Sequence, residues 1–320
     1  MIPIKLQQGR HRLTRMANLR EISKRMSSIR SIMQITRTMS MISTARIRKA
    51  LERSKEAEPY KDALTRMLAN VASAGFDEAM PLLQTHLEEH AVLFILIASD
   101  RGLAGGFNIL QQRLVEREMQ SLAEKGVKSY IITCGRKPTE YFTYRKMKPV
   151  LSFVGISSDP NQDEAERIAS YVSDAYTSGR VDRVELLYWH ARNRVDQDAV
   201  HEQLLPISKE QLMMPNRPRT PEALSNVNKM QYTEFEFDPS ATEVLSYLMP
   251  AYIKTVIFHA LLDSAAAEHG ARRRAMQSAT DNAKEVLRTL GRTYNRVRQG
   301  SITTELNEII GGASALEDNN

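Results

Sequence analysis

Two short stretches of the chain carry residue types at spacings that could support chemistry. The first is the glycine-rich stretch 100–108, DRGLAGGFN, which lies between an apolar run and an amphipathic segment. Such a turn can hold a phosphate, because backbone N–H groups at a helix N-terminus face the anion. Its glycines do not form G-x-G-x-x-G, no acidic residue follows the next strand at Cys134, and no G-x-x-x-x-G-K-[ST] occurs. A tight turn beneath a closely packed helix is the plainer interpretation.

The second stretch, residues 86–90, matches the H-x-x-E-H arrangement of some zinc proteases. On a helix, this spacing would place His86 and His90 on one face, with Glu89 beside them. The stretch directly precedes a strand, however, so the rest of a helix has no room, and no third ligand is evident. A solvated turn is the alternative that we expect.

The remaining titratable residues do not form a catalytic set. His259 and His269 lie on or near the packing face of a predicted C-terminal helix, where a hydrogen-bonded core histidine is the ordinary role. Cys134 is the one cysteine, which excludes an internal disulfide and a zinc site built on several thiolates. We therefore predict no catalytic, cofactor-binding or metal-binding residue, and no cofactor.

Charge is distributed unevenly over the 320 residues. The chain holds 44 Lys and Arg against 38 Asp and Glu, a net charge of +6. Residues 1–55 carry 14 basic and two acidic residues (+12), residues 254–299 carry nine and four (+5), and the rest must carry 6 − 12 − 5 = −11. The basic ends predict an anionic partner, such as phosphate, lipid or an acidic protein surface.

The basic N-terminal region is predicted to be a long helix. Apolar residues recur there at spacings of three and four, which is the a/d pattern of a coiled coil. Ile35, Met39 and Ile42 are expected to continue this face with a small drift, and Pro59 to kink or break the helix. The residues of the regular stripe are Leu19, Ile22, Met26, Ile29 and Met33.

The middle of the chain alternates strand and helix signals, which favours a mostly parallel α/β sheet. Predicted strands cover residues 91–99, 127–134, 150–154 and 183–189, and predicted helices cover 109–124 and 163–177. Residues 213–220 are a proline-broken loop. The longest uninterrupted apolar run, residues 91–98, is eight residues long. A membrane-spanning helix needs about 20, so we expect none.

The C-terminal region is predicted to be a second long helix. Ser240 or Thr242 can cap its start, with Glu243 completing a capping box, and Pro250 would kink it or mark its first turn. Two heptad rows with small residues predict close helix approach: Met276, Ala283, Leu290 and Val297, and Thr280, Leu287, Tyr294 and Ser301. Neither long helix can bury its stripe alone, so the two are expected to pair with each other or with another chain.

These residues resemble the gamma subunit of F-type ATP synthases, of the bacterial type. The similar segments are residues 16–51, the turn 100–108, residues 268–285 and residues 294–315, so the resemblance covers nearly the whole chain. It implies an α/β fold in which long N- and C-terminal helices form an antiparallel coiled coil around an inserted Rossmann-like domain. The implied domains are an extension at 1–15, expected to be disordered, a helix at 16–75, the α/β domain at 76–238, a helix at 239–312 and a tail at 313–320.

The resemblance also implies a function. Such a subunit is the central-stalk rotor that turns inside a ring of three alpha and three beta subunits and couples proton flow to ATP synthesis or hydrolysis on the beta subunits. Its implied partners are those subunits, the epsilon subunit and the c-ring, with no nucleic acid and no membrane insertion of its own. Its implied location is the cytoplasmic side of the cell inner membrane, as a peripheral subunit. The implied chain is not an enzyme by itself.

The resemblance carries six contact residues to this sequence. The residues implied to meet the catch loops of the beta subunits are Arg37, Met39, Arg298, Gln299, Thr303 and Glu305, with Ile35 and Thr36 beside the first two. Ordinary solvated helix charges are the alternative for Arg37 and Arg298. The chain differs from many relatives at Ala104, where they have cysteine. It also has glycines at 270, 291 and 300, each of which weakens a helix by about 1 kcal/mol relative to alanine.

Three further interpretations stay open at this stage. Residues 1–15 are a basic arm, a transit-like segment, or a result of Met16 being the true start. The turn at 100–108 leaves open a stand-alone dinucleotide-binding enzyme. The basic helix leaves open a coiled-coil nucleic-acid-binding protein, although no aromatic residue lies in it before Tyr60.

Overall fold

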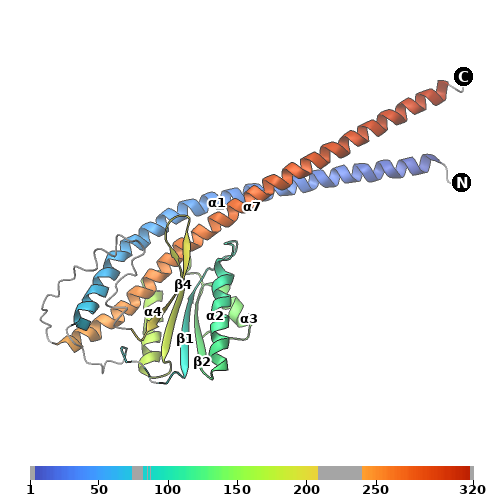
Figure 1. Cartoon of the computed structure of the whole chain (residues 1–320). Coiled ribbons are helices and arrows are strands. Elements are labelled where there is room, and N and C mark those ends of the chain that lie inside the picture. Colours follow the sequence, from blue (N-terminus) through green and yellow to red (C-terminus); the bar gives the residue numbers. More distant parts are fainter. Residues whose placement is uncertain (1–3, 74–81, 85, 87, 208–239, 318–320) are drawn as a thin grey trace. The chain divides into compact units, whose positions relative to one another are not determined.

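The computed structural model describes residues 4–73, 82–84, 86, 88–207 and 240–317. The chain divides into two compact units (Figure 1). The first, which we call the coil unit, contains residues 1–42 and 275–320, and the second, the α/β unit, contains residues 43–274. The domain limits drawn from the sequence remain predictions. The proline-broken loop at 213–220 lies outside the described residues.

Helix α1 runs from Ile4 to Ser73 and contains Pro59 in its interior. Of the two outcomes predicted for Pro59, a break is wrong, because the helix continues through it although proline cannot donate the usual backbone hydrogen bond; a kink there stays a prediction. The helix also begins earlier than expected, since residues 4–15 belong to α1 where we predicted a disordered extension.

Helix α7 runs from Ala241 to Glu317. The predicted cap is confirmed on the serine side, because the backbone N–H of Glu243 donates to Ser240 Oγ at 3.2 Å. Pro250 is inside the helix and marks neither its start nor its end.

Helix α7 is long and apolar enough to span a membrane, by length and composition alone, although the sequence predicted no such segment. An 18-residue window within residues 242–311 reaches a mean hydropathy of 1.4, and 44% of that window is buried within the protein. Such a window can contain up to two charged residues, so it can be strongly apolar on average without a long uninterrupted apolar run. The buried core helix of a globular protein passes the same test, and the α7 segment 253–271 is such a helix here.

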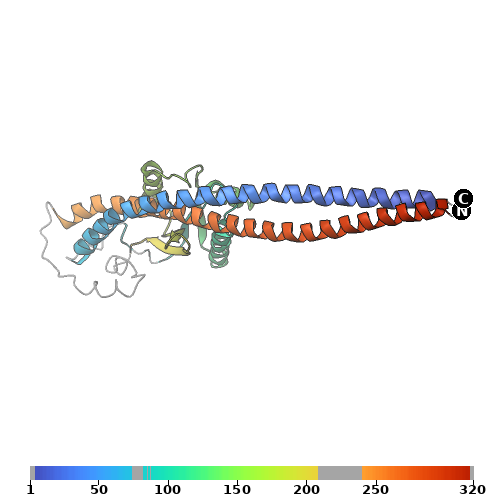
Figure 2. The same ribbon diagram turned by 90° about the horizontal axis from the view of Figure 1, so that it is seen from above.

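In the coil unit, α1 and α7 run antiparallel (Figure 2). The hydroxyls of Thr36 and Thr280 are 2.8 Å apart in the seam, and Thr280 also donates to the carbonyl of Met276 at 2.8 Å. All eight residues of the two predicted heptad rows of α7 are buried or half-buried. The predicted pairing of the two long helices is therefore confirmed within this unit.

The seam of α1 follows a different path from the one predicted. Ile35 and Ile42 are 59% and 50% exposed, so they do not continue the apolar face. The seam instead runs from Met33 to Ile47 through three small hydroxyl residues, Thr36, Ser40 and Ser43. Successive seam residues are three or four positions apart. Small side chains allow the close helix approach that the alanines and threonines of α7 favour, and the larger isoleucines are left outside.

The α/β unit contains a five-stranded sheet of order β3-β2-β1-β4-β5. Its strands are β1 (Ala91–Ile97), β2 (Lys128–Cys134), β3 (Leu151–Phe153), β4 (Arg183–Ala191) and β5 (Gln197–Leu205). The first four are parallel, as the alternation of strands and helices predicts, and β5 is antiparallel to β4. Strand β5 was not predicted, because its alternating exposed residues lack a continuous apolar run.

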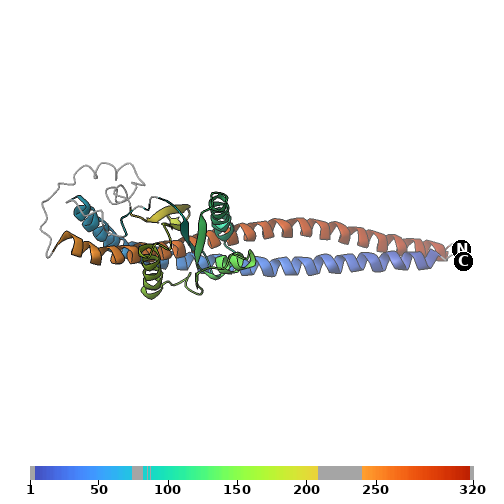
Figure 3. The same cartoon turned by 90° about the horizontal axis from the view of Figure 1, so that it is seen from below.

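Helices cover both faces of this sheet (Figures 1 and 3). On one face, α2 (Phe107–Glu124) and α3 (Arg136–Tyr144) enclose a core that includes Phe94, Val115 and Phe142. On the other face, α4 (Gln162–Thr177) and the neighbouring parts of α1 and α7 enclose a core that includes Tyr176 and Ile257. The architecture is thus a doubly wound α/β sheet carried by two long helices.

Candidate functional site: two coil surfaces and a crevice filled by α7

The predicted contact residues of α1 divide between the seam and the outer surface. Thr36 is buried and donates to the carbonyl of Met33 at 3.1 Å, so it belongs to the seam. Met39 is half-buried, whereas Ile35 and Arg37 are exposed. Within the described residues Arg37 has no ion pair, and an unpaired cation beside an exposed isoleucine is available to a partner.

The predicted contact residues of α7 are mostly on the surface. Arg298, Gln299 and Thr303 are exposed, and Glu305 is half-buried. The Thr303 hydroxyl donates to the carbonyl of Gln299 at 3.0 Å, within the helix. No ion pair involves Arg298 in the parts of the chain that the structure describes. An exposed apolar row follows them at Ile302, Leu306, Ile309 and Ile310.

The two sets of contact residues lie at different levels of the coil. Thr36 lies opposite Thr280, and Arg298 is 298 − 280 = 18 residues further along α7. At about 1.5 Å per residue, this separates the two sets by about 27 Å along the helix axis. They therefore form two surfaces rather than one cluster.

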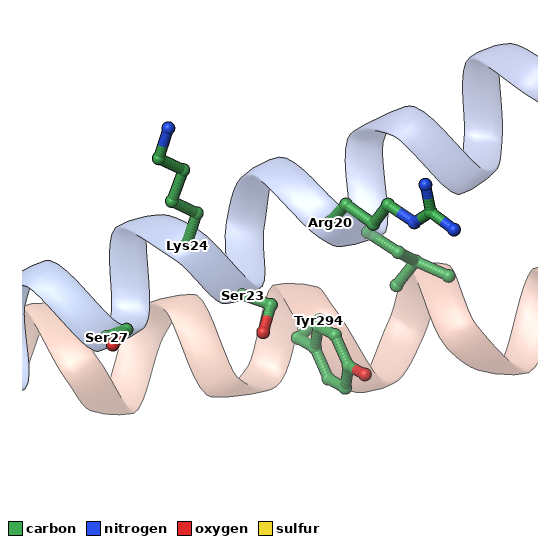
Figure 4. A pocket seen from close by; sticks show the side chains of 6 residues that line it. Arg20, Ser23, Lys24, Ser27 and Tyr294 are labelled. Atoms are coloured by element: carbon green, nitrogen blue, oxygen red, sulfur yellow. The ribbon is translucent and has the colours of Figure 1, made fainter.

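A hollow also lies between α1 and α7 in this unit (Figure 4). Lys24 points away from Tyr294, and Ser23 points toward the helix that carries Tyr294. Two serines opposite one tyrosine leave the seam unfilled here, which accounts for the hollow without a ligand. Its lining residues are Leu19, Arg20, Ser23, Lys24, Ser27 and Tyr294.

The glycine-rich turn of the α/β unit uses an internal carboxylate where a phosphate would bind. Asp100 accepts three backbone hydrogen bonds, from Arg136 and Gly155 at 2.8 Å and from Ser157 at 3.0 Å. Burial alone would raise the pKa of Asp100, but these donors hold its pKa below the ordinary value. The carboxylate, which follows β1, thus takes up N–H groups that follow the carboxyl ends of β2 and β3. A nucleotide phosphate would have to displace it.

The crevice in which α/β sheets bind ligands is filled by α7. In this strand order the crevice lies between the carboxyl ends of β1 and β4. A buried cluster joins residues of these ends to α7, and its members are Ala104, Phe107, Ala191, Ala266, Ala267 and Ala271. The Arg272 guanidinium donates to the carbonyls of Arg101 and Gly102 at 3.2 and 3.3 Å. These contacts oppose the dinucleotide-site interpretation of the turn.

A buried ion pair on α7 anchors this arrangement. Arg272 Nη2 lies 2.7 Å from Glu268 Oε1, and their side chains are 9% and 2% exposed. Burial raises the pKa of Glu268, while the adjacent Arg272 opposes that shift. Charged residues within the buried stretch of α7 are a sequence signal that apolar periodicity alone does not reveal.

The zinc-protease-like stretch does not form a metal site. His86 Nδ1 lies 2.6 Å from Asp182 Oδ1 and its ring stacks on Tyr176. His90 is directed toward Glu88 instead and is three-quarters exposed. Within the described residues there is no group of three or more side chains that could hold a metal ion. For His86, both the zinc-ligand interpretation and the solvated-turn interpretation are wrong, because its side chain is packed against Tyr176 and bonded to Asp182.

Asp182 explains why His86 is held in place. Its second carboxylate oxygen accepts from the backbone N–H groups of His90 and Ala91 at 2.8 Å, at the start of β1. Burial would raise the pKa of Asp182, but the bond from His86 and these two N–H groups lower it.

The single cysteine, Cys134, is buried, and burial raises the pKa of its thiol, so it is not a reactive nucleophile.

Comparison with known proteins identifies the family. A family model described as ATP synthase matches residues 18–316. The ATP synthase gamma chain of Desulfitobacterium hafniense is 38% identical over 302 residues, which cover 94% of this chain and 100% of the relative. The gamma chain of Chlorobaculum tepidum is 38% identical over 306 residues, with the same coverage.

The chain belongs to the ATP synthase gamma chain family.

Solved structures of distant relatives share the fold of this gamma chain family member. A chain of the Euglena gracilis mitochondrial ATP synthase superposes with a TM-score of 0.63 at 17% identity, covering 95% of this chain and 96% of that one. A chain from the central stalk and c-ring of the Tetrahymena thermophila enzyme gives 0.55 at 23% identity, covering 77% and 99%. The fold expected from the resemblance, long terminal helices around an inserted α/β domain, is therefore correct.

Proposed function

We propose that this chain is the central-stalk rotor subunit of an ATP synthase. In this role the coil unit turns inside a ring of alpha and beta subunits, and catalysis takes place on the beta subunits. The observation that carries the proposal is the alignment of gamma chains with 94% of this chain, including both terminal helices. A rotor needs a stiff shaft, and a seam closed by the chain's own side chains supplies one.

The two coil surfaces are the proposed contacts with the ring. We assign the catch loops of the beta subunits to Arg37 and Met39 at one level, and to Arg298, Gln299, Thr303 and Glu305 at the other. The exposed guanidinium groups favour acidic loops, because arginine binds carboxylates through two parallel hydrogen bonds. Each beta subunit would meet a different face of the turning coil. Its nucleotide site would then shift population according to which face it contacts.

The remaining partners follow from the same role. The α/β unit would contact the epsilon subunit and the c-ring, and proton flow through the membrane sector would turn them together. The chain would then be a peripheral subunit on the cytoplasmic side of the cell inner membrane, without a membrane segment of its own. The packing of the α7 segment 253–271 in the core of the α/β unit supports that last point, although only 44% of the most apolar window of the helix is buried.

Reconstitution tests the proposal. The chain is co-expressed with its cognate alpha and beta subunits, and ATP hydrolysis is measured with and without it. We expect a complex with one copy per three beta subunits that is active only when the chain is present, and no turnover by the chain alone. A ring that assembles and hydrolyses ATP equally well without the chain would refute the proposal.

The contact surfaces need their own variants. Arg298→Ala and Arg37→Ala should slow ATP hydrolysis by the complex several-fold. Arg288→Ala is the matched control, since Arg288 is equally exposed on α7 but lies outside the proposed surfaces. Equal rates for all three variants would remove the assignment of these arginines while leaving the rotor role intact.

A further inference from the structure

The β4–β5 hairpin of the α/β unit has a stiff tip. The Asn193 side chain accepts from the backbone N–H groups of Val195 and Asp196 at 2.7 and 2.8 Å and donates to the Asp196 carboxylate at 3.0 Å. These bonds close the turn 192–196 on itself. Figure 3 shows the hairpin, in yellow, beside the orange part of α7.

The end of β4 next to the turn is bonded to α7 through a buried carboxylate. Asp263 of α7 is 3% exposed at its side chain. One of its oxygens accepts from the backbone N–H of Ala191 at 3.0 Å, and the other pairs with His190 Nδ1. A buried carboxylate is stable only when it is paired, so this contact fixes one end of the hairpin on the helix.

The tip of the hairpin is seated on a glycine of the same helix. A Cβ atom added at Gly270 would lie 2.2 Å from Gln197 Nε2, so a side chain there would displace Gln197. Beside it, Arg273 donates to the carbonyl of Arg194 at 3.3 Å, and Arg274 donates to Gln197 Oε1. The sequence suggested that this glycine softens the helix, whereas the structure shows that it admits the hairpin.

The contacting residues of α7 share one face. Asp263 and Gly270 are seven residues apart, and Arg273 and Arg274 follow three and four residues later, so all of them lie on the same side of the helix. Next to the hairpin turn the apolar contacts of α7 are made by small alanines, which offer little resistance to swivelling, whereas large residues such as Ile253 and Ile257 pack in the core further along the helix. Hydrogen bonds and ion pairs are directional, and such groups set register where apolar packing does not.

We propose that the β4–β5 hairpin is a grip that fixes the α/β unit in register and rotation on α7, with Asp263 and Gly270 as its positioning residues. This inference rests on the proposed rotor function, because a rotor must pass torque from its α/β part to its coil. Without the grip, the α/β part would slip on the helix under load. ATP hydrolysis would continue, while the number of protons pumped per ATP would fall.

A matched pair of glycine substitutions tests the grip. Gly270→Leu pushes a side chain into the hairpin seat, whereas Gly291→Leu places the same side chain on α7 where no other atom lies within 4 Å of the new Cβ. In the full chain, the backbone amides of residues 190–197 should exchange hydrogen at least tenfold faster in Gly270→Leu than in Gly291→Leu. In the complete ATP synthase, reconstituted with its membrane sector into sealed vesicles, Gly270→Leu should lower the protons pumped per ATP at least twofold and retain hydrolysis.

A second-site change separates the seat from a general helix effect. Gln197→Ala removes the amide that the new leucine would strike and leaves the contacts of Asp263 and Arg273 in place, so Gly270→Leu with Gln197→Ala should regain at least half of the lost pumping. If Gly270→Leu does not fold, the triple variant Gln197→Ala, Arg273→Ala, Arg274→Ala removes the tip contacts by surface truncation and should show the same losses. Equal pumping ratios and equal exchange in the seat and control variants would overturn the grip.

The outcome is distinguishable from failure of the rotor role. If the wild-type chain does not activate the ring, the proposed function fails, and hydrogen exchange in the full chain still reports on the hairpin contact. If the wild-type complex pumps normally and the Gly270→Leu complex pumps equally well, only the grip is wrong.

Discussion

Acidification should destabilise the α/β unit through one buried histidine. His269 of α7 is 3% exposed, and burial lowers its pKa to about 4, assisted by the positive charges of Arg272 and Arg46. The ordinary histidine pKa of 6.5 is the reference for the unfolded chain. The unfolded state therefore binds more protons between pH 6.5 and pH 4, so the free energy of unfolding falls as the pH falls through that window.

The expected size of this effect follows from the two pKa values. Each tenfold change in proton affinity is worth about 1.4 kcal/mol, so a pKa lowered from 6.5 to about 4 gives a loss of at most about 3 kcal/mol. Glutamine does not titrate. The free energy of unfolding of the His269→Gln variant should therefore fall less on acidification than that of the wild type, by at most that amount. His90→Gln is the control, because His90 is three-quarters exposed.

A single intrinsic probe reports on this unit. Trp189 is the one tryptophan of the chain; it stacks on Phe107 and donates to its carbonyl at 2.8 Å. Urea unfolding followed by tryptophan fluorescence at pH 7.5, 6, 5 and 4.5 therefore measures the stability of the α/β unit. Parallel pH profiles for wild type and His269→Gln would refute the reasoning, and so would an equal flattening in His90→Gln.

Three further variants test individual contacts. The pKa of His201 is raised, first by its hydrogen bond to the buried Glu185, so its contribution is present below pH 6.5 and is lost as the pH rises through the raised value; His201→Gln should cost about 0.5–1 kcal/mol at pH 6 and nothing at pH 9, by urea unfolding. Asp100→Ala leaves three backbone N–H groups without their acceptor and should cost about 2–4 kcal/mol in the same assay, whereas Asp100→Asn, which keeps one acceptor oxygen, should cost less. Thr280→Val removes one of the two partners of the Thr36 hydroxyl, which keeps its bond to the carbonyl of Met33, and should lower the thermal midpoint of the coil unit by circular dichroism; Thr36→Val with Thr280→Val should recover most of the loss, because the apolar pair leaves no hydroxyl with an incomplete set of partners in the seam.

Periodicity and apolar runs were sufficient to predict the main elements. Strand β1 is buried at every residue, which is why its continuous apolar run could be recognised. The heptad rows of α7 predicted the seam because their residues recur every seven positions and therefore share one side of the helix. Helix α3 was missed because it has nine residues, one of them Pro138, and shows no long amphipathic pattern.

Local patterns could not predict which partner each residue meets. Ile35 is apolar and lies near the stripe, yet the seam takes Thr36, because the choice depends on the small residues of a helix about 240 positions away. The same limit applies to Asp263 and Gly270. Their purpose depends on a hairpin that lies about 70 residues earlier in the chain, and neither residue type indicates it alone.

For the candidate contact residues as well, the sequence predicts surface exposure but not the level at which each residue lies along the coil. The exposure of Arg37 and Arg298 is consistent with their expected position on the outer surface of the coil. That they lie at two levels follows only from the register of α1 against α7, which the sequence leaves undetermined until Thr36 is seen opposite Thr280.

Direct observation of rotation tests the rotor role most sharply. Cys134 is buried, so an engineered Lys125→Cys thiol on the exposed end of α2 can be labelled selectively with a probe. The alpha and beta ring is fixed to a surface, and the probe on this chain is followed while ATP is supplied. We predict continuous rotation in one direction that stops when ATP is withdrawn. A stationary probe on rings that are hydrolysing ATP would contradict the account.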